Sequence, residues 1–353
     1  MDTKPGAAGA HLAGAHRAGA PAVVIGASAG GVEALKQLVG ALPHGFPSPI
    51  FIVLHVGDVS YMPEILARAG SLPVVRPRSG ERIVPGSIYV APPERHMLVH
   101  DDHILLRRGP REILARPAID PLFRSAACSF GARTIGVILT GSLGDGASGL
   151  RAIKRCGGIA IVQDPADAIV PDMPRNALAH VEVDHCVALA ELGGLLAMLV
   201  AEPPREMIAI PEEICLEAAV AAQEHVNMQT EEKLGSLSPF VCPECSGPLW
   251  EIEDGKILRY RCHAGHALSA EAMLSAQATE AENMIERLLR VHQQRAALAR
   301  RIATRDLAEG RHDSAGRMQE KAREYERDAE MVGHLLDDRD VRAGDDPAPD
   351  QRT

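Results

Sequence analysis

The sequence predicts an α/β protein whose mostly parallel sheet is covered by helices on both faces, with an antiparallel hairpin, a small zinc ribbon and a C-terminal helical hairpin. Short runs rich in valine and isoleucine alternate with amphipathic stretches over about the first 200 residues, a pattern typical of a parallel sheet buried on both sides. After residue 202 the composition changes, and a group of cysteines and histidines follows. We therefore expect one larger α/β domain and a separately built C-terminal part.

Composition limits the class of protein. With 353 residues, 46% of them hydrophobic, the chain is long enough for two or more domains and apolar enough for a folded core. The net charge of -10 and the pI near 5.8 argue against a general binder of nucleic acid or anionic membranes, because both are polyanions. No run approaches the roughly 20 apolar residues that span a bilayer, and the N-terminus lacks the apolar core of a signal peptide. Seven cysteines do not form the pattern of a secreted disulfide framework. We expect a cytoplasmic protein without membrane insertion.

Five apolar runs predict the strands of the larger domain. They are AVVIG (22–26), PIFIVLHV (49–56), PVVRP (73–77), RTIGVILTG (133–141) and GGIAIVQD (157–164). Helical patterns separate them, namely VEALKQLVGAL, YMPEILARAG, PLFRSAACSFGA and SGLRAIKRC, and ELGGLLAMLV closes the domain near residue 200. The stretch GSIYVAPPERHMLVHDDHILLRR has no helix between its apolar runs and predicts an antiparallel hairpin or meander.

Composition and periodicity divide the chain into six segments. They are a disordered N-terminus (1–20), the α/β domain (21–201), a linker with room for a short helix (202–238), a zinc-ribbon-like module (239–268), a helical hairpin (269–337) and a disordered tail (338–353).

The hairpin is predicted from two apolar stripes with 4,3 spacing. The first comprises Met284, Leu288, Val291, Leu298 and Ile302, and the second comprises Ala315, Met318, Ala322, Tyr325, Ala329, Val332 and Leu336. A turn is expected at Glu309-Gly310. Two such stripes can pack against each other as an antiparallel pair, and the pattern leaves open whether they also contact a partner or a second copy of the chain.

The stretch from Gly26 to Gly30 connects the first predicted strand to the first helix and matches G-x-S-x-G, with Ser28 at its centre. A nucleophilic serine on a tight turn, a purely structural glycine turn and a phosphate-binding loop all fit this pattern. The phosphate loop is disfavoured because Ser28 stands where G-x-G-x-x-G has its middle glycine, and because the second strand ends in His55 and not in an acidic residue.

A serine nucleophile needs a base and a carboxylate that orients the base. His55 ends the second predicted strand, and Asp145 follows the fourth in TGSLGDGASG. The carboxyl ends of parallel strands share one edge of a sheet, so Ser28, His55 and Asp145 can converge there. A histidine at a strand end or an aspartate between glycines is often only structural, but three such residues at one edge favour a catalytic triad. The order Ser, His, Asp differs from that of the α/β-hydrolase fold.

Several motifs together carry a resemblance to a known family. IGASAGGVEAL, VLHV, GSIYVAPPERHMLV, DPLFRSAA, GVILTGSLGDGASGL and QDPADAIVPDMPRNAL occur in the order found in the catalytic domain of chemotaxis protein-glutamate methylesterases of the CheB type. The resemblance covers about residues 20 to 200. It implies a Ser-His-Asp carboxylic ester hydrolase that releases methanol from glutamate methyl esters of chemoreceptors, with glutamine deamidation in some members.

The resemblance also implies residue roles. Ser28 is then the nucleophile, His55 the general base and acid, and Asp145 the orienting carboxylate, while backbone amides near Gly141 and Ser142 are candidate oxyanion donors. The sequence departs from the family where Ala29 replaces a common threonine and where the loop before Asp145 is GSLGDG. Only about 20 residues precede the first strand, whereas the receiver domain of familiar members needs roughly 100. We therefore expect a form without a receiver.

A second chemical signal lies in the cysteine-bearing segment. Cys242 and Cys245 form a C-x-x-C knuckle, and Cys262-His263-Ala264-Gly265-His266 follows a hairpin-like stretch, all within 25 residues. Cys242, Cys245, Cys262 and His266 make the best tetrahedral zinc set, with His263 as the alternate fourth ligand. Unrelated cysteines and a redox C-x-x-C are the competing interpretations. Residues 240 to 268 hold four acidic and three basic residues, which does not favour nucleic-acid binding. The ribbon with its following helices resembles extensions of some methylesterase-type proteins.

Two functional hypotheses from different classes follow. The first is a protein-glutamate methylesterase acting on a methylated chemoreceptor or sensor protein, without a catalytic cofactor and with a structural zinc. The second is a catalytically weak adaptor of the same fold that binds a methyltransferase or sensor protein. A separate response regulator is a further possible partner, and the oligomeric state stays open.

Overall fold

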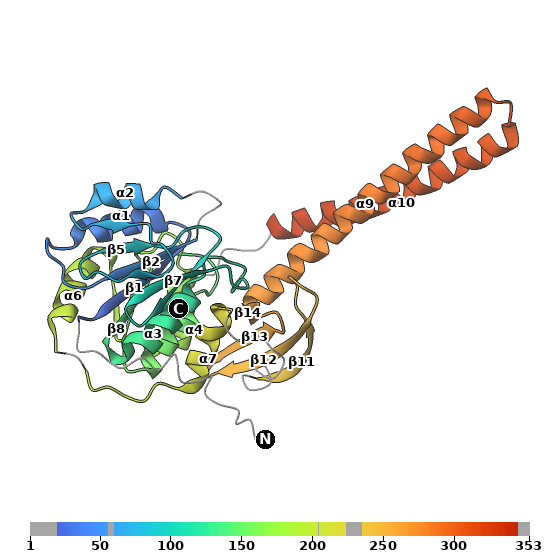
Figure 1. Cartoon of the computed structure of the whole chain (residues 1–353). Coiled ribbons are helices and arrows are strands. Elements are labelled where there is room, and N and C mark those ends of the chain that lie inside the picture. The colour runs from blue at the N-terminus through green and yellow to red at the C-terminus, as the bar shows by residue number, and fades with distance from the viewer. Residues whose placement is uncertain (1–19, 56–59, 204, 224–234, 345–353) are drawn as a thin grey trace, which may run out of the picture. The chain divides into compact units, whose positions relative to one another are not determined.

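The computed structural model describes residues 20–55, 60–203, 205–223 and 235–344, and the larger of its two compact units ends at Met273. A seven-stranded parallel sheet forms the centre of this unit (Figure 1). Its strands, in spatial order, are β10 (His185–Val187), β9 (Ile159–Gln163), β8 (Thr134–Ile138), β1 (Ala22–Ala27), β2 (Ile50–Leu54), β5 (Ile88–Val90) and β3 (Val74–Val75). The predicted α/β class and all five predicted strands are confirmed.

Helices cover both faces of this sheet, as the layers in Figure 1 show. One face packs on α1 (Gly31–Ala41), α2 (Met62–Ala69) and α6 (Leu189–Ala201). The other packs on α3 (Ile119–Phe130), α4 (Ala147–Arg155) and α5 (Asp172–His180), and the 3₁₀ turn Gly131–Arg133 follows α3. Alternate residues of the central strands enter the two cores, so that Val23 faces the first and Val24 the second.

The order of the strands determines where a ligand can bind. β1 pairs with β2 on one side and with β8 on the other, and the connections run outward in opposite directions from this point. In open parallel sheets, ligands bind beyond the carboxyl ends of the strands where the order reverses. The residues that follow β1, β2 and β8 therefore lie around one crevice.

The predicted antiparallel segment is present beside the main sheet. β6 (His96–His100) and β7 (His103–Arg107) form a hairpin, and β4 (Glu81–Arg82) pairs with β7 at its edge. The first run of this segment, β5, instead joins the parallel sheet next to β2. The chain then continues through residues 108–118 into α3.

The segment 202–238, predicted as a linker with room for a short helix, contains α7 (Glu212–Ala221). One side of this helix packs on α3, where Ile214 and Ala218 belong to the same core cluster as the strands. Glu217 of the same helix is 5% exposed although it is charged. The α/β core thus includes a helix that follows residue 202.

The cysteine-bearing module is a four-stranded antiparallel sheet. Its strands are β11 (Ser236–Val241), β12 (Pro248–Asp254), β13 (Ile257–Cys262) and β14 (Ala267–Ser269). A small apolar cluster supports it and includes Leu249, Tyr260 and Leu268. Ile113, from the segment before α3, belongs to this cluster as well. The module therefore shares its core with the α/β domain.

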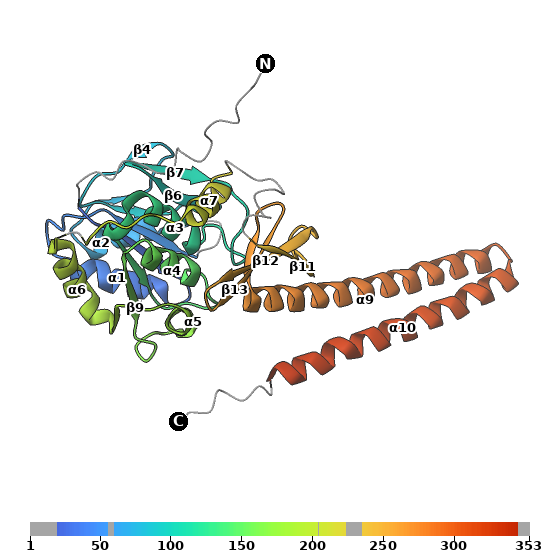
Figure 2. The same ribbon diagram turned by 90° about the horizontal axis from the view of Figure 1, so that it is seen from below.

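Two long helices follow, α9 (Ala270–Ala308) and α10 (His312–Gly344), and they run antiparallel as Figure 2 shows. On α10 the predicted stripe is buried at Ala315, Ala322, Ala329 and Val332. On α9 the prediction was wrong, because the side chains of the predicted stripe are exposed, among them Met284, Leu288 and Val291. The face one residue further on is buried instead, at Ala296, Ala299 and Ala303. Small alanines on both helices allow close approach, and Arg295 lies over the Tyr325 ring at 3.9 Å.

Among the described residues, no helix combines the length and the apolar character that a bilayer-spanning segment requires. Nearly all of the predicted N-terminal disordered stretch, residues 1–19, and residues 345–353 of the predicted tail lie outside the described part of the chain. Helix α10 continues through residues 338–344, where the disordered tail was predicted to begin.

Candidate functional site

Ser28 lies on the turn between β1 and α1. Gly30 adopts φ 77, a left-handed conformation that glycine tolerates, and the Gly31 N–H donates to the Ser28 carbonyl at 2.8 Å. The Thr140 hydroxyl donates to the Ala29 carbonyl at 2.9 Å, so a residue beyond β8 holds the turn. A Cβ on Gly141 would lie 2.7 Å from the Ser28 Cβ, which explains a glycine there. The turn leaves the Ser28 side chain half-buried at the crevice.

His55 follows β2 and lies between Ser28 and Asp145. Its Nδ1 is 3.2 Å from the Ser28 Oγ, and its Nε2 is 2.8 Å from the Asp145 Oδ2. With the proton on Nε2, the imidazole donates to Asp145, and Nδ1 is left to accept the Ser28 hydroxyl proton. The imidazole is 21% exposed, so one edge remains open to a substrate. The three residues predicted to converge do so.

The start of α3 holds the Asp145 carboxylate. The Ile119 N–H donates to Oδ2 at 2.7 Å and the Asp120 N–H donates to Oδ1 at 3.1 Å. These are the first amides of the helix, which have no partner within it and favour a negative charge. The Asp145 side chain is 1% exposed. It is therefore held in position as the acceptor for the Nε2–H of His55.

The two predicted oxyanion donors differ in their availability. The Gly141 N–H donates to the Val170 carbonyl at 2.9 Å, so it is occupied in this conformation. Within the described part of the chain, no residue accepts the Ser142 N–H. The turn after Ser28 adds the backbone N–H of Ala29, the position that supplies an oxyanion donor in serine turns of this type. Among the described residues neither of these two N–H groups, of Ser142 and Ala29, has a hydrogen-bond partner, which makes them the candidate oxyanion donors.

An open groove of about 480 Å³ adjoins the triad. His55 and Leu143 line it together with Arg111 and residues 113–117. We call the segment 111–117 the lip. Glu94 lies at the margin and accepts a 2.5 Å hydrogen bond from Arg116, with Arg108 and Arg111 each at 3.8 Å. The bond from Arg116 is the main reason that the pKa of Glu94 lies below its usual value. Three arginines against one carboxylate give this margin a net positive charge.

Asp120 is a buried carboxyl next to the triad. Its Oδ1 accepts the Gly149 N–H at 2.6 Å, and Arg124 Nη1 lies 4.0 Å from its Oδ2. Burial, and then the negative charge of Asp145, raise the pKa of Asp120 from its ordinary 3.8 to about 7. Folding therefore favours a proton on Asp120 in the pH range where an exposed aspartate has lost it.

The Asp120→Asn variant should have a flatter dependence of stability on pH. A carboxyl whose pKa is raised by folding costs stability as the pH rises from about 4 to about 7, and an amide does not titrate. Relative to wild type, the variant should therefore gain roughly 2–4 kcal/mol between pH 4 and pH 8. Urea unfolding at several pH values measures this gain. A constant difference between the two proteins across that range would show that Asp120 stays ionised.

The ribbon brings four of the predicted ligands together. The ligand atoms of Cys242, Cys245, Cys262 and His266 all lie within 4.8 Å of one another. The Cys245 and Cys262 Sγ atoms are 3.5 Å apart, and His266 Nδ1 lies 3.4 Å from Cys262 Sγ and 3.8 Å from Cys242 Sγ. His263, the alternate ligand, is exposed and is not a member of this group.

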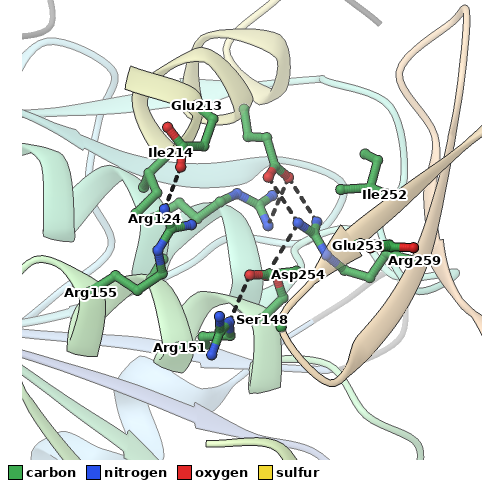
Figure 3. A pocket seen from close by; sticks show the side chains of 13 residues that line it. Arg124, Ser148, Arg151, Arg155, Glu213, Ile214, Ile252, Glu253, Asp254 and Arg259 are labelled. Carbon is green, nitrogen blue, oxygen red and sulfur yellow. Dashed lines mark hydrogen bonds and ion pairs between the residues drawn. The ribbon is translucent and has the colours of Figure 1, made fainter. Parts of the chain in front are cut away.

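A group of buried charges joins the ribbon to the α/β domain. Arg259 of β13 forms two hydrogen bonds to Glu217 of α7, at 2.8 and 2.9 Å, and Arg261 reaches the same carboxylate at 2.9 Å. Beside them is a cavity of about 300 Å³, into whose margin Arg124, Arg151, Asp254 and Arg259 project (Figure 3). No sequence motif predicts these residues, because isolated charges in separate elements show no spacing pattern.

A parallel α/β sheet with Ser, His and Asp converging beyond its carboxyl ends defines a serine hydrolase-type protein. Residues 23–196 match the model of the family described as CheB methylesterase. A Leptospira interrogans protein with the provisional name protein-glutamate methylesterase/protein-glutamine glutaminase is 40% identical over 182 residues, which are 50% of this chain and 94% of that protein. The chain belongs to the CheB methylesterase family.

Two further relatives agree with this assignment. Protein-glutamate methylesterase/protein-glutamine glutaminase 4 of Geobacter metallireducens is 42% identical over 161 residues, 44% of this chain and 46% of that protein. The crystal structure of the Thermotoga maritima CheB methylesterase catalytic domain superposes with a TM-score of 0.50 at 30% identity, covering 52% of this chain and all of that domain. These matches concern the α/β domain.

Proposed function

We propose that this protein hydrolyses glutamate methyl esters on a chemoreceptor-type protein and releases methanol. The observation that carries the proposal is the hydrogen-bonded series from Ser28 through His55 to Asp145, at 3.2 and 2.8 Å, beside an open groove. The names of the relatives support the ester as substrate and add glutamine deamidation as a second activity.

The geometry supports a two-step mechanism. His55 Nδ1 takes the hydroxyl proton as Ser28 Oγ attacks the ester carbonyl carbon, and the Asp145 carboxylate stabilises the imidazolium through Nε2–H. The amides of Ala29 and Ser142 would meet the oxyanion. His55 then donates its proton to the leaving methoxide, and methanol departs from a Ser28 ester. Water, deprotonated by His55, attacks this ester and leaves a free glutamate and the original hydroxyl.

The positive margin of the groove favours an acidic substrate surface. Arg108, Arg111 and Arg116 outnumber Glu94, and both Arg108 and Arg111 have substantially exposed side chains. A receptor segment that carries free glutamates beside the methylated one would be attracted to this margin, and salt would weaken the attraction. A receptor methyltransferase and a separate response regulator remain predictions as partners, as does a cytoplasmic location.

The direct test is methanol release from methylated receptor fragments by the full-length protein. We expect time-dependent methanol formation from the esterified fragments and none from the same fragments after alkaline demethylation. A panel of fragments from different receptors would identify the substrate. If no fragment in a broad panel releases methanol while the protein binds one of them, the adaptor hypothesis replaces the proposed function.

A further inference from the structure

The ribbon site has the donors and the dimensions of a structural zinc site. Three thiolates and one imidazole are a standard tetrahedral set, and zinc bonds of about 2.3 Å to sulfur and 2.0 Å to nitrogen place the ligand atoms roughly 3.5–3.8 Å apart. Three of the separations between these atoms, 3.4 to 3.8 Å, match this, and all of them are within 4.8 Å. Two backbone turns shape the site, in which Ser246 N–H donates to the Cys242 carbonyl and Gly265 N–H donates to the Cys262 carbonyl, each at 2.8 Å.

The lip of the catalytic groove has an unfavourable backbone. Ile113 and Leu114 adopt φ 49 and φ 63, left-handed values that are rare for bulky side chains and most costly for a β-branched one. Two such residues in succession persist only where surrounding contacts hold them. Both line the groove, so the contacts that hold them also define the shape of the groove.

Those contacts come from residues next to the zinc ligands. Ala267, which follows His266, accepts the Ile113 N–H at 2.7 Å, and its own N–H donates to the Arg111 carbonyl at 3.2 Å. The Ile113 side chain is 5% exposed and packs in the ribbon cluster with Cys242 and Cys262. The strained residues of the lip are therefore fastened to the ribbon beside its ligands.

A buried ion pair makes a second connection at the same place. Arg261, which precedes Cys262, is fully buried and lies 3.4 Å from the Glu112 carboxylate, and it also donates to the Gly265 carbonyl at 3.0 Å within the ligand turn. Glu112 in turn pairs with Arg124 of α3, the helix whose first amides hold Asp145. Arg261 and Ala267, the residues on either side of the turn from Cys262 to His266, thus both hold the lip.

We propose that Cys242, Cys245, Cys262 and His266 bind one zinc ion, and that the zinc-bound turn clamps the lip in its strained, groove-forming conformation. The ion takes no part in bond making in this scheme. Its loss would free the lip at Arg111–Leu114 and enlarge the conformational range of the groove. The effect on the reaction rests on the proposed function, whereas zinc binding and the state of the lip do not.

The test uses the full-length protein with Cys245→Ser as the disruptive variant. Cys245→His restores a four-ligand set, and Cys186→Ser removes an exposed cysteine of β10 as the matched control. The measurements are zinc per chain, the rate of tryptic cleavage after Arg111, and KM and kcat for a methylated fragment. Wild type, Cys245→His and Cys186→Ser should carry about one zinc per chain and resist cleavage.

Cys245→Ser, and wild type treated with 1,10-phenanthroline under reducing conditions, should lose zinc and be cleaved after Arg111 at least about tenfold faster. Zinc added back to the chelated wild type should reverse the cleavage, which guards against a variant that fails to fold. KM for a methylated fragment should rise more than kcat falls, because the lip positions the substrate and the triad stays in place.

Freshly purified, reduced protein without zinc would overturn the proposal, and so would zinc loss that leaves cleavage after Arg111 unchanged. A protein that passes both tests but hydrolyses no ester would contradict only the proposed function.

Discussion

The Ser28→Ala variant should lose nearly all hydrolysis of glutamate methyl esters, by about 10⁴-fold or more. The alanine has no oxygen to attack the ester, and His55 then has no proton to take from the side chain 3.2 Å away. His55→Ala should cost about as much, because nucleophile and base act as one unit and their losses do not add. Methanol release under saturating substrate measures both variants.

Asp145→Asn should retain a small residue of activity. The amide keeps the shape of the side chain, but its NH2 group donates a hydrogen bond to His55 Nε2 where the carboxylate accepted one. The imidazole then carries its proton on Nδ1 and can no longer accept the proton of Ser28. We expect the three variants to remain folded, because each changes few atoms at the edge of the sheet. Their thermal unfolding curves, recorded beside the wild type, check this.

A matched control separates catalysis from general damage. Ser48 is a buried serine just before β2, at the opposite end of that strand from His55, and no described residue pairs with its hydroxyl. Ser48→Ala should keep wild-type turnover. A serine-directed phosphonylating reagent should label wild type at Ser28 and label His55→Ala far more slowly. Wild-type turnover by Ser28→Ala would contradict the role of Ser28 as nucleophile and leave the glycine-flanked turn with a structural role alone.

The sequence was sufficient to predict the parallel sheet and the convergence of the triad. Ser28 and His55 each follow a buried strand directly, and the carboxyl ends of parallel strands must meet at one edge, so order along the chain was enough to place both residues. Asp145 could be placed at the same edge because its loop follows another such strand. The grouping of the four proposed zinc ligands could also be predicted, since C-x-x-C and a second knuckle have a recognisable spacing.

Contacts between elements that are distant in the sequence could not be predicted in this way. Glu112, Glu217 and Arg261 belong to a loop, a helix and a strand that no periodicity relates, and their partnership depends on how the ribbon packs on α3 and α7. The apolar stripe on α9 was misassigned for a related reason. Size and polarity predict which side chains prefer burial, but on α9 the face with Ala296, Ala299 and Ala303 is buried. Small side chains allow the two helices to approach closely.

Glu217→Gln should destabilise the larger unit by about 3–5 kcal/mol. The Glu217 carboxylate is 5% exposed and lies within ion-pair distance of Arg124, Arg259 and Arg261, at 3.7, 2.8 and 2.9 Å. An amide of the same shape leaves these buried cations with one counter-charge fewer, and water cannot replace it. Urea unfolding followed by Trp250 fluorescence reports the loss at the ribbon, where the tryptophan lies.

Glu213→Gln, on the same helix, is the matched control. Glu213 is half exposed and pairs with Arg155 at the surface, so its loss should cost less than about 1 kcal/mol.

The dependence of stability on pH provides a second test of the role of Glu217. Burial alone would raise the pKa of Glu217, but the charges of Arg259 and Arg124 outweigh it and hold the pKa well below 4.5. The contribution of this carboxylate to stability is thus fully present above about pH 5 and is lost as the pH falls through its pKa in the folded protein. The difference between Glu217→Gln and wild type should be constant from pH 6 to pH 8 and shrink in acid, whereas equal, pH-independent costs for the two glutamine variants would show that the buried charges do not fasten the ribbon.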